Sequence, residues 1–168
     1  MTGLPVSVII PNRDRTRSLA RTLAALKRQS LRGFEVVIVS NRAEEITRAI
    51  PQARDAIIVP FEPANISRAR NAGCAAASGE ILAFCDDDAV PEPTWLARLI
   101  APFSRAQVGA TGGLVRGRNG VSLQWGFQEV DAFGNDWPLP RPDAPFTGAP
   151  TPGRVLKKIG RASCRERV

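Results

Sequence analysis

The chain has 168 residues, 43% of them hydrophobic, and a formal net charge of +7 at pH 7. This length is sufficient for one domain with a real hydrophobic core. The complete absence of histidine excludes a Ser-His-Asp mechanism and an ordinary zinc site within the chain. The basic residues are scattered and form no known nucleic-acid-binding motif, so we expect no nucleic-acid partner.

Strand-like and helix-like segments alternate along the first part of the chain. Runs rich in β-branched residues predict strands, and apolar residues spaced by three and four predict helices. The strands are expected at Val6–Ile10, Glu35–Val39, Ala56–Val59 and Ile81–Cys85, with a weaker fifth at Val108–Val115. The helices are expected at Arg15–Gln29, Ala43–Ile50, Asn65–Ala77 and Pro93–Phe103, the third capped by Asn65. This alternation predicts an α/β fold with a mostly parallel sheet.

Three consecutive aspartates, Asp86 to Asp88, directly follow the apolar run that ends at Cys85. Two like charges about 4 Å apart repel by ~4 kcal/mol at an effective dielectric of ~20, so three adjacent carboxylates favour a cation or another partner. Acidic triplets also occur in solvated loops and at helix N-termini. A position after a buried strand, where open α/β sheets bind ligands, favours Mg²⁺ or Mn²⁺ shared with substrate phosphates.

Polar segments also follow the three other expected strands. They are Pro11-Asn12-Arg13, Ser40-Asn41 and Asn65–Asn71. The carboxyl ends of parallel strands share one edge of a sheet, so we expect these segments to lie near the aspartates. Each has a plainer reading: Pro11 and Asn12 also suit a turn that ends the strand, and Arg68 and Arg70 also suit a solvated helix face.

The order and spacing of six segments between residues 5 and 115 resemble the family 2 glycosyltransferases. The segments are Val6–Arg13, Phe34–Val39, Ser67–Gly73, Ala77–Phe84, Asp86–Asp88 and Pro93–Leu96. The resemblance implies the GT-A fold, a Rossmann-like and mostly parallel sheet flanked by helices. It also implies an inverting enzyme that moves a sugar from a nucleotide-diphosphate sugar, with a UDP-sugar favoured, to a hydroxyl of an unknown glycan or lipid acceptor.

The resemblance also implies roles for individual residues. Asp86 and Asp88 match the D-x-D motif and would hold Mg²⁺ or Mn²⁺ on the diphosphate, with Asp88 as the main ligand. Asp87 would contribute through ribose contacts or the metal shell. The substrate-binding residues that it implies are Pro11, Asn12, Arg13, Asn41, Arg68, Arg70, Asn71, Asp86 and Asp87.

Two departures from the family pattern bear on the substrate. Many relatives carry an acidic residue after the second strand, where it reads the base, but this chain has Ser40-Asn41. The identity of the base therefore stays open. The downstream carboxylate that serves the family as catalytic base has no match before Lys158. The available carboxylates, Glu129, Asp131, Asp136 and Asp143, are better explained as surface residues, so no catalytic residue is assigned.

The last ten residues, Ile159–Val168, look foreign to the protein. They lack apolar periodicity and match, residue for residue, the translation of a string that resembles a sequencing-library adapter. A genuine basic tail is the alternative. We expect residues 1–117 to form the nucleotide-sugar-binding half, residues 118–158 a partial, loop-rich acceptor-side region, and residues 159–168 a non-native tail. On this interpretation the chain is C-terminally truncated after Lys158.

Two other functions stay open at this stage. A sugar-phosphate nucleotidyltransferase should carry a Gly-rich phosphate loop after its first strand, where this chain has Pro11-Asn12-Arg13-Asp14. A non-catalytic nucleotide-binding domain is the other alternative. The three cysteines show no metal or redox spacing and fit a reducing compartment. We therefore expect a cytoplasmic protein, with association at the inner face of the membrane left open through the missing C-terminus.

Overall fold

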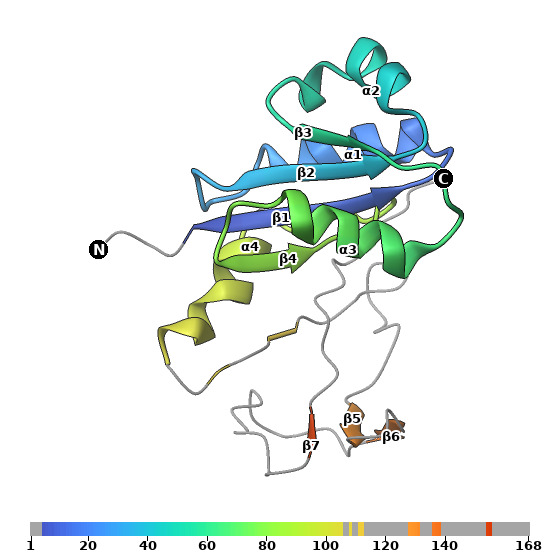
Figure 1. Cartoon of the computed structure of the whole chain (residues 1–168). Coiled ribbons are helices and arrows are strands. Elements are labelled where there is room, and N and C mark those ends of the chain that lie inside the picture. Colours follow the sequence, from blue (N-terminus) through green and yellow to red (C-terminus); the bar gives the residue numbers. More distant parts are fainter. Residues whose placement is uncertain are drawn as a thin grey trace.

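The computed structural model describes residues 5–105, 108, 111 and 112, and the backbone of three short strands farther along the chain. Helices and strands alternate in the first part, as predicted (Figure 1). The elements are β1 (Val6–Asn12), α1 (Thr16–Leu26), β2 (Glu35–Ser40), α2 (Ala43–Ala49), β3 (Ile57–Pro60), α3 (Ile66–Ala76), β4 (Ile81–Phe84) and α4 (Trp95–Ile100). Short 3₁₀ segments, η1 (Pro51–Ala53) and η2 (Ala101–Ser104), follow α2 and α4. The fold class is α/β.

The four strands form one parallel sheet in the order β3-β2-β1-β4. Strand β1 lies in the middle, where Ile9 pairs with Val37 of β2 on one side and with Phe84 of β4 on the other. The arrows of β1, β2 and β4 point to the same side of Figure 1. We call that side, where all four strands end, the carboxyl edge, and it is where such sheets place their ligand sites.

Strand β1 is longer than predicted. Pro11 and Asn12 were expected to end the strand, but they pair in register with Val39 and Ser40 of β2. The reason is the direction of the peptide groups. Ile9 accepts a hydrogen bond from the backbone N–H of Cys85, so Pro11, two residues on, faces the same side beyond the end of β4. A proline there removes no ladder hydrogen bond.

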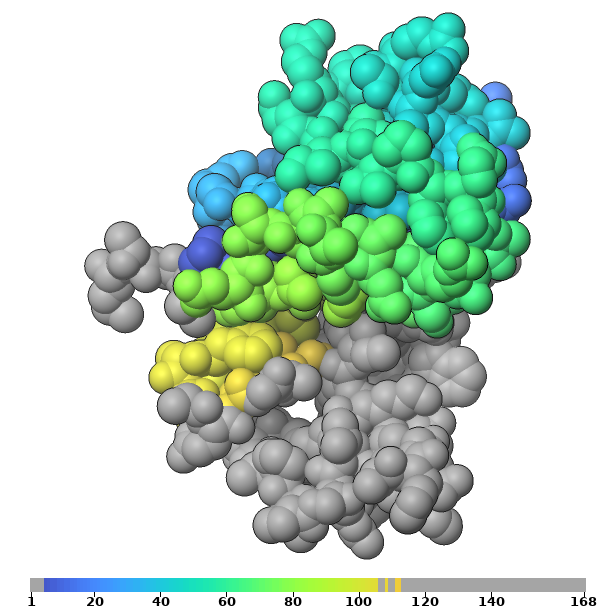
Figure 2. Space-filling view, viewed as in Figure 1, coloured from blue at the N-terminus to red at the C-terminus, as the bar shows by residue number. Residues whose placement is uncertain are grey.

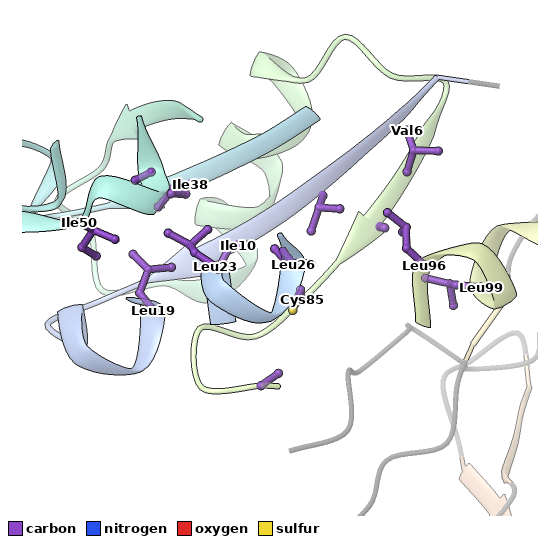
Figure 3. Packing of buried hydrophobic residues seen from close by; sticks show 14 of the residues in the cluster. Val6, Ile10, Leu19, Leu23, Leu26, Ile38, Ile50, Cys85, Leu96 and Leu99 are labelled. Carbon is purple, nitrogen blue, oxygen red and sulfur yellow. The ribbon is translucent and has the colours of Figure 1, made fainter. Parts of the chain in front are cut away.

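Alternate residues of β1 pack against helices on opposite faces of the sheet. Val6, Val8 and Ile10 join the larger core. In Figure 3 this core lies between the strands and α1, whose leucines are part of it, and Leu96 and Leu99 of α4 lie at its end. Ile9 faces the other way, into a smaller cluster with Val37, Val39 and Ala69 of α3. Residues of α3 form much of the surface on that face in Figure 2.

Helix α3 begins and packs as its sequence predicts. The side chain of Asn65 accepts a hydrogen bond from the backbone N–H of Arg68 at 2.9 Å, which confirms the predicted N-cap. Gly73 lets the helix lie directly on the sheet, because a Cβ atom there would stand 2.5 Å from Ile9 Cγ2. This close packing fixes the distance of α3 from the sheet, and with it the position of the first turn of α3 at the carboxyl edge.

The remaining differences concern element ends. Helix α1 ends at Leu26 rather than Gln29, and α4 is followed by the 3₁₀ segment Ala101–Ser104. The fifth strand predicted at Val108–Val115 falls largely outside the described residues. Farther along, β5 (Gln128–Asp131), β6 (Asp136–Pro138) and β7 (Arg154–Val155) form an antiparallel sheet in the order β6-β5-β7. The described helices include none with the length and apolar character needed to cross a bilayer.

Candidate functional site

The three aspartates occupy a tight turn just after β4. The backbone N–H of Ala89 donates to the carbonyl of Asp86 at 3.2 Å, which places Asp87 and Asp88 at the centre of the turn. The side chain of Asp87 is 9% exposed, whereas those of Asp86 and Asp88 are 29% and 34% exposed. One carboxylate therefore points into the protein and two remain within reach of a ligand.

Asp87 anchors the turn to the end of β1. Its Oδ2 accepts a hydrogen bond from Asn12 Nδ2 at 2.8 Å, and its Oδ1 accepts one from Arg15 Nη1 at 3.4 Å. Asn12 Oδ1 in turn accepts from the hydroxyl of Ser40 at 2.8 Å. Burial raises the pKa of Asp87, while the donors from Asn12 and Arg15 act against that rise. The ends of β1, β2 and β4 are thereby joined by one chain of buried polar contacts.

Two arginines pair with the outward carboxylates. Arg15 Nη1 lies 2.9 Å from Asp88 Oδ2, and Arg70 Nη2 lies 3.2 Å from Asp86 Oδ1. Arg70 comes from α3, so its contact joins the two faces of the sheet at the carboxyl edge. Its Nε is buried and has no hydrogen-bond partner among the residues that the structure describes. An arginine with an unused donor beside a carboxylate suits an additional acceptor oxygen, such as that of a phosphate.

The loop after β1 is fixed by a second polar network. Asp14 has a φ of 57°, a left-handed conformation that aspartate tolerates better than most residues. Asp14 Oδ1 accepts hydrogen bonds from Arg42 Nε at 2.7 Å and Asn41 Nδ2 at 3.1 Å. The hydrogen bond from Arg42 and that from Asn41 lower the pKa of Asp14. The loops after β1 and β2 therefore hold each other at the carboxyl edge.

The structure brings most of the predicted site residues to this edge. Asn12 donates to Asp87 and Arg70 donates to Asp86, in the same turn that holds Asp88. Arg13 donates to the carbonyl of Glu62 at 2.7 Å, and so reaches the loop before α3. Pro11 is buried, Asn41 is engaged with Asp14, and Arg68 and Asn71 are exposed on α3. Glu129, Asp131, Asp136 and Asp143 have no described side chain.

Sequence reasoning missed Arg15 and Thr22 as parts of this site, whereas Ser40 lies where its segment was expected. Arg15 was expected only as the start of a helix, although it lies three residues after Asn12 and can turn back to the same edge. The Thr22 hydroxyl lies 2.9 Å from the carbonyl oxygen of Asp87. A threonine on an apolar helix stripe was the only available signal, since its hydroxyl needs a partner when buried.

The oxygen ligands at this edge fit a hard divalent cation. No group of three or more Asp, Glu, Cys or His side chains among the described residues could hold a metal ion. Mg²⁺ commonly uses only one or two protein carboxylates and completes its shell with water and substrate phosphates. Asp86 and Asp88, both partly exposed, supply that number. Asp86 and Asp88 would therefore suit a cation that binds together with an anionic ligand.

Comparison with known proteins assigns the chain to a family. The profile of Glycosyl transferase family 2 matches residues 7–152. Glycosyltransferase AglE of Haloferax volcanii is 35% identical over 118 residues, which cover 66% of this chain and 39% of AglE. The chain spans less than half the length of each curated relative that it matches.

Solved structures agree on the fold. Mannosyltransferase PcManGT from Pyrobaculum calidifontis, in complex with GDP-Man and Mn²⁺, aligns with a TM-score of 0.59 and 24% identity over 69% of this chain and 36% of its own. Residues 1–349 of S. aureus TarS, in complex with UDP-GlcNAc, align with a TM-score of 0.52 and 23% identity over 59% of this chain and 32% of that chain. With its GT-A-type α/β sheet and its matched segments, the chain belongs to Glycosyl transferase family 2.

Proposed function

We propose that this chain forms the donor-binding half of an inverting glycosyltransferase and binds a nucleotide-diphosphate sugar together with Mg²⁺ or Mn²⁺. The aspartate turn carries the proposal: it presents Asp86 and Asp88 at the carboxyl edge and buries Asp87 against Asn12. Family membership supports sugar transfer as the reaction. The acceptor would be a hydroxyl of a glycan or lipid.

The outward carboxylates would hold the cation, with Asp88 as the main ligand because it is the more exposed. When bound, the cation would neutralise the charge that develops on the departing nucleotide diphosphate. Arg15 would exchange its contact with Asp88 for a phosphate oxygen. Such an exchange costs little, since the Arg15 side chain is 57% exposed and exposed ion pairs contribute only about 0–1 kcal/mol.

The remaining residues divide between contact and support. Arg70, with its buried unpartnered Nε, is the strongest candidate for contact with phosphate or base. Arg13, Arg68 and Asn71 would lie beside the donor at the same carboxyl edge. Pro11 and Asn12 would shape it from β1, and Asn12 would act mainly through Asp87, because both of its polar atoms are already used.

The base of the donor is proposed as uracil or guanine. The two structural neighbours contain UDP-GlcNAc and GDP-Man, and we favour the uridine nucleotide. Asn41, the residue after β2, exchanges two hydrogen bonds with Asp14. Base recognition at that position would therefore use Asp14 and Asn41 as a unit. We assign no catalytic base among the described residues.

Calorimetric titration of the protein with UDP and GDP in the presence of MnCl₂ tests this proposal. Asp88→Asn should weaken the Mn²⁺-dependent binding by tenfold or more, as expected for loss of a charged ligand. The matched control is Asp55→Asn, which removes the same charge from an exposed aspartate before β3 and should bind like the wild type. Equal binding by Asp88→Asn and wild type would refute the metal assignment.

A further inference from the structure

Thr22 occupies an unusual position for a polar residue. It lies on the buried stripe of α1 with Leu19, Leu23 and Leu26, and its exposed fraction is 0%. An apolar residue would satisfy the helix pattern at this place. A hydroxyl there would be costly without a hydrogen-bond partner. The side chain is therefore explained by what its hydroxyl contacts.

The Thr22 hydroxyl is directed at the aspartate turn. Its Oγ1 lies 2.7 Å from the carbonyl oxygen of Ala89 and 2.9 Å from that of Asp87. The carbonyl of Ser18, one turn back in the same helix, is farther away at 3.3 Å. Threonine in a helix commonly bonds back to that carbonyl, but here the two nearest acceptors both belong to the turn.

These two carbonyls lie on either side of Asp88 in the sequence. The hydroxyl has one proton, which it donates to one of these carbonyls or shares between them. Either arrangement restrains the backbone next to Asp88 from inside the protein, while Asn12 and Arg15 hold the side chain of Asp87 from the edge of the sheet. We propose that Thr22 is a positioning residue that sets the direction of the Asp88 carboxylate for cation binding. This inference rests on the proposed function, because it assigns Thr22 a task in the same site.

The contact differs from general support of the segment after β4. Gln29, three residues after the end of α1, also has a fully buried side chain. Its Nε2 donates to the carbonyl of Glu92 at 2.8 Å, and its Oε1 accepts from the N–H of Leu96 at 2.9 Å. Gln29 therefore fixes the start of α4, whereas Thr22 contacts the turn itself.

The test compares variants with and without the hydroxyl. Thr22→Val keeps the shape of the side chain and removes the hydroxyl. Thr22→Ala removes both the hydroxyl and the methyl group, and Thr22→Ser retains the hydroxyl. The control is Ser7→Ala, which removes another fully buried hydroxyl at the opposite end of β1. Electron paramagnetic resonance of free Mn²⁺ in the presence of UDP gives the cation affinity, and thermal unfolding in EDTA gives the stability.

Thr22→Val and Thr22→Ala should weaken the Mn²⁺ affinity by about tenfold or more, the range seen when a second-layer partner of a metal ligand is lost. Thr22→Ser should restore wild-type affinity. Ser7→Ala should lower the unfolding temperature but keep the Mn²⁺ affinity within about twofold of the wild type.

Wild-type Mn²⁺ affinity in a folded variant without the hydroxyl would overturn the role of Thr22 and leave the proposed function intact. The same holds if Thr22→Ser binds as weakly as Thr22→Val, or if Ser7→Ala weakens the cation as much as Thr22→Val does. If the wild-type protein shows no Mn²⁺-dependent binding of UDP or GDP, the proposed function fails and this inference fails with it.

Discussion

The carboxylates of Asp86, Asp87 and Asp88 are chemically identical, and a turn makes them different. In a turn successive side chains leave the backbone in different directions, so one can be buried while its neighbours stay accessible. Asp87 is buried against Asn12, and burial raises its pKa. Asp86 and Asp88 pair with arginines whose side chains come from outside the turn. The buried carboxylate of Asp87 therefore anchors the turn, whereas those of Asp86 and Asp88 can exchange their arginine partners for a ligand.

Gly73 illustrates how a single residue sets the height of a helix above the sheet. Gly73→Ala should destabilise the protein, although alanine is the better helix former by about 1 kcal/mol. The added Cβ would stand 2.5 Å from Ile9 Cγ2 and 3.1 Å from Val39 Cγ2. Overpacking of this kind typically costs about 1–3 kcal/mol, which exceeds the gain in propensity.

Urea unfolding of Gly73→Ala measures the net effect, with Ser67→Ala as the control at an exposed position of the same helix. The control should stay within about 0.5 kcal/mol of the wild type. An increase in the free energy of unfolding of Gly73→Ala would contradict the close packing of α3 on β1.

At the scale of elements, Glu35 joins three segments at the amino end of the sheet. The hydroxyl of Ser7 in β1 donates to Glu35 Oε1 at 2.9 Å, and the hydroxyl of Ser78, after α3, donates to Glu35 Oε2 at 2.6 Å. The hydrogen bond from the Ser78 hydroxyl is the main reason that the pKa of Glu35 is lowered. This contact ties β1, β2 and the α3–β4 connection together, far from the carboxyl edge.

Glu35→Gln should make the protein less sensitive to acid. A carboxyl whose pKa is lowered by folding stabilises the folded state above its ordinary pKa of 4.5, and that contribution is lost as the pH falls through the lower folded-state value. The wild type should therefore lose more stability than Glu35→Gln when the pH falls below about 4.5.

Chemical unfolding at a series of pH values from about 6 to 3 measures this difference across the window in which linkage applies. Glu80→Gln, at an exposed glutamate, is the control and should follow the wild-type pH dependence. A Glu35→Gln curve parallel to that of the wild type would show that the Ser7 and Ser78 contacts do not hold the carboxylate in solution.

At the scale of the whole molecule, the sequence is enough to predict the α/β alternation, because each strand and helix carries its own period. Residues such as Val8 and Ile10, or Leu19 and Leu23, satisfy those periods directly. The extension of β1 through Pro11 could not be predicted. It depends on which side of the strand lacks a neighbour, and that is set by the length of β4.

The site was predictable to the same extent and for the same reason. Residues that follow a strand were expected at the carboxyl edge, and Asn12, Arg70 and the aspartates are found there in contact. Thr22 and Arg15 could not be found this way, since Thr22 lies within α1 and Arg15 is the residue just before it, and both reach the site through tertiary contacts. The burial that separates Asp87 from its neighbours also depends on tertiary contacts.

The central claim is that a nucleotide diphosphate and a divalent cation bind at the carboxyl edge of this sheet. Hydrogen–deuterium exchange with UDP and MnCl₂ tests the location directly. The account predicts slower exchange in residues 12–15, 40–42 and 85–89 and unchanged exchange at residues 78–81, which lie at the amino end. Protection confined to the amino end, or none at the aspartate turn under conditions where UDP binds, would contradict it.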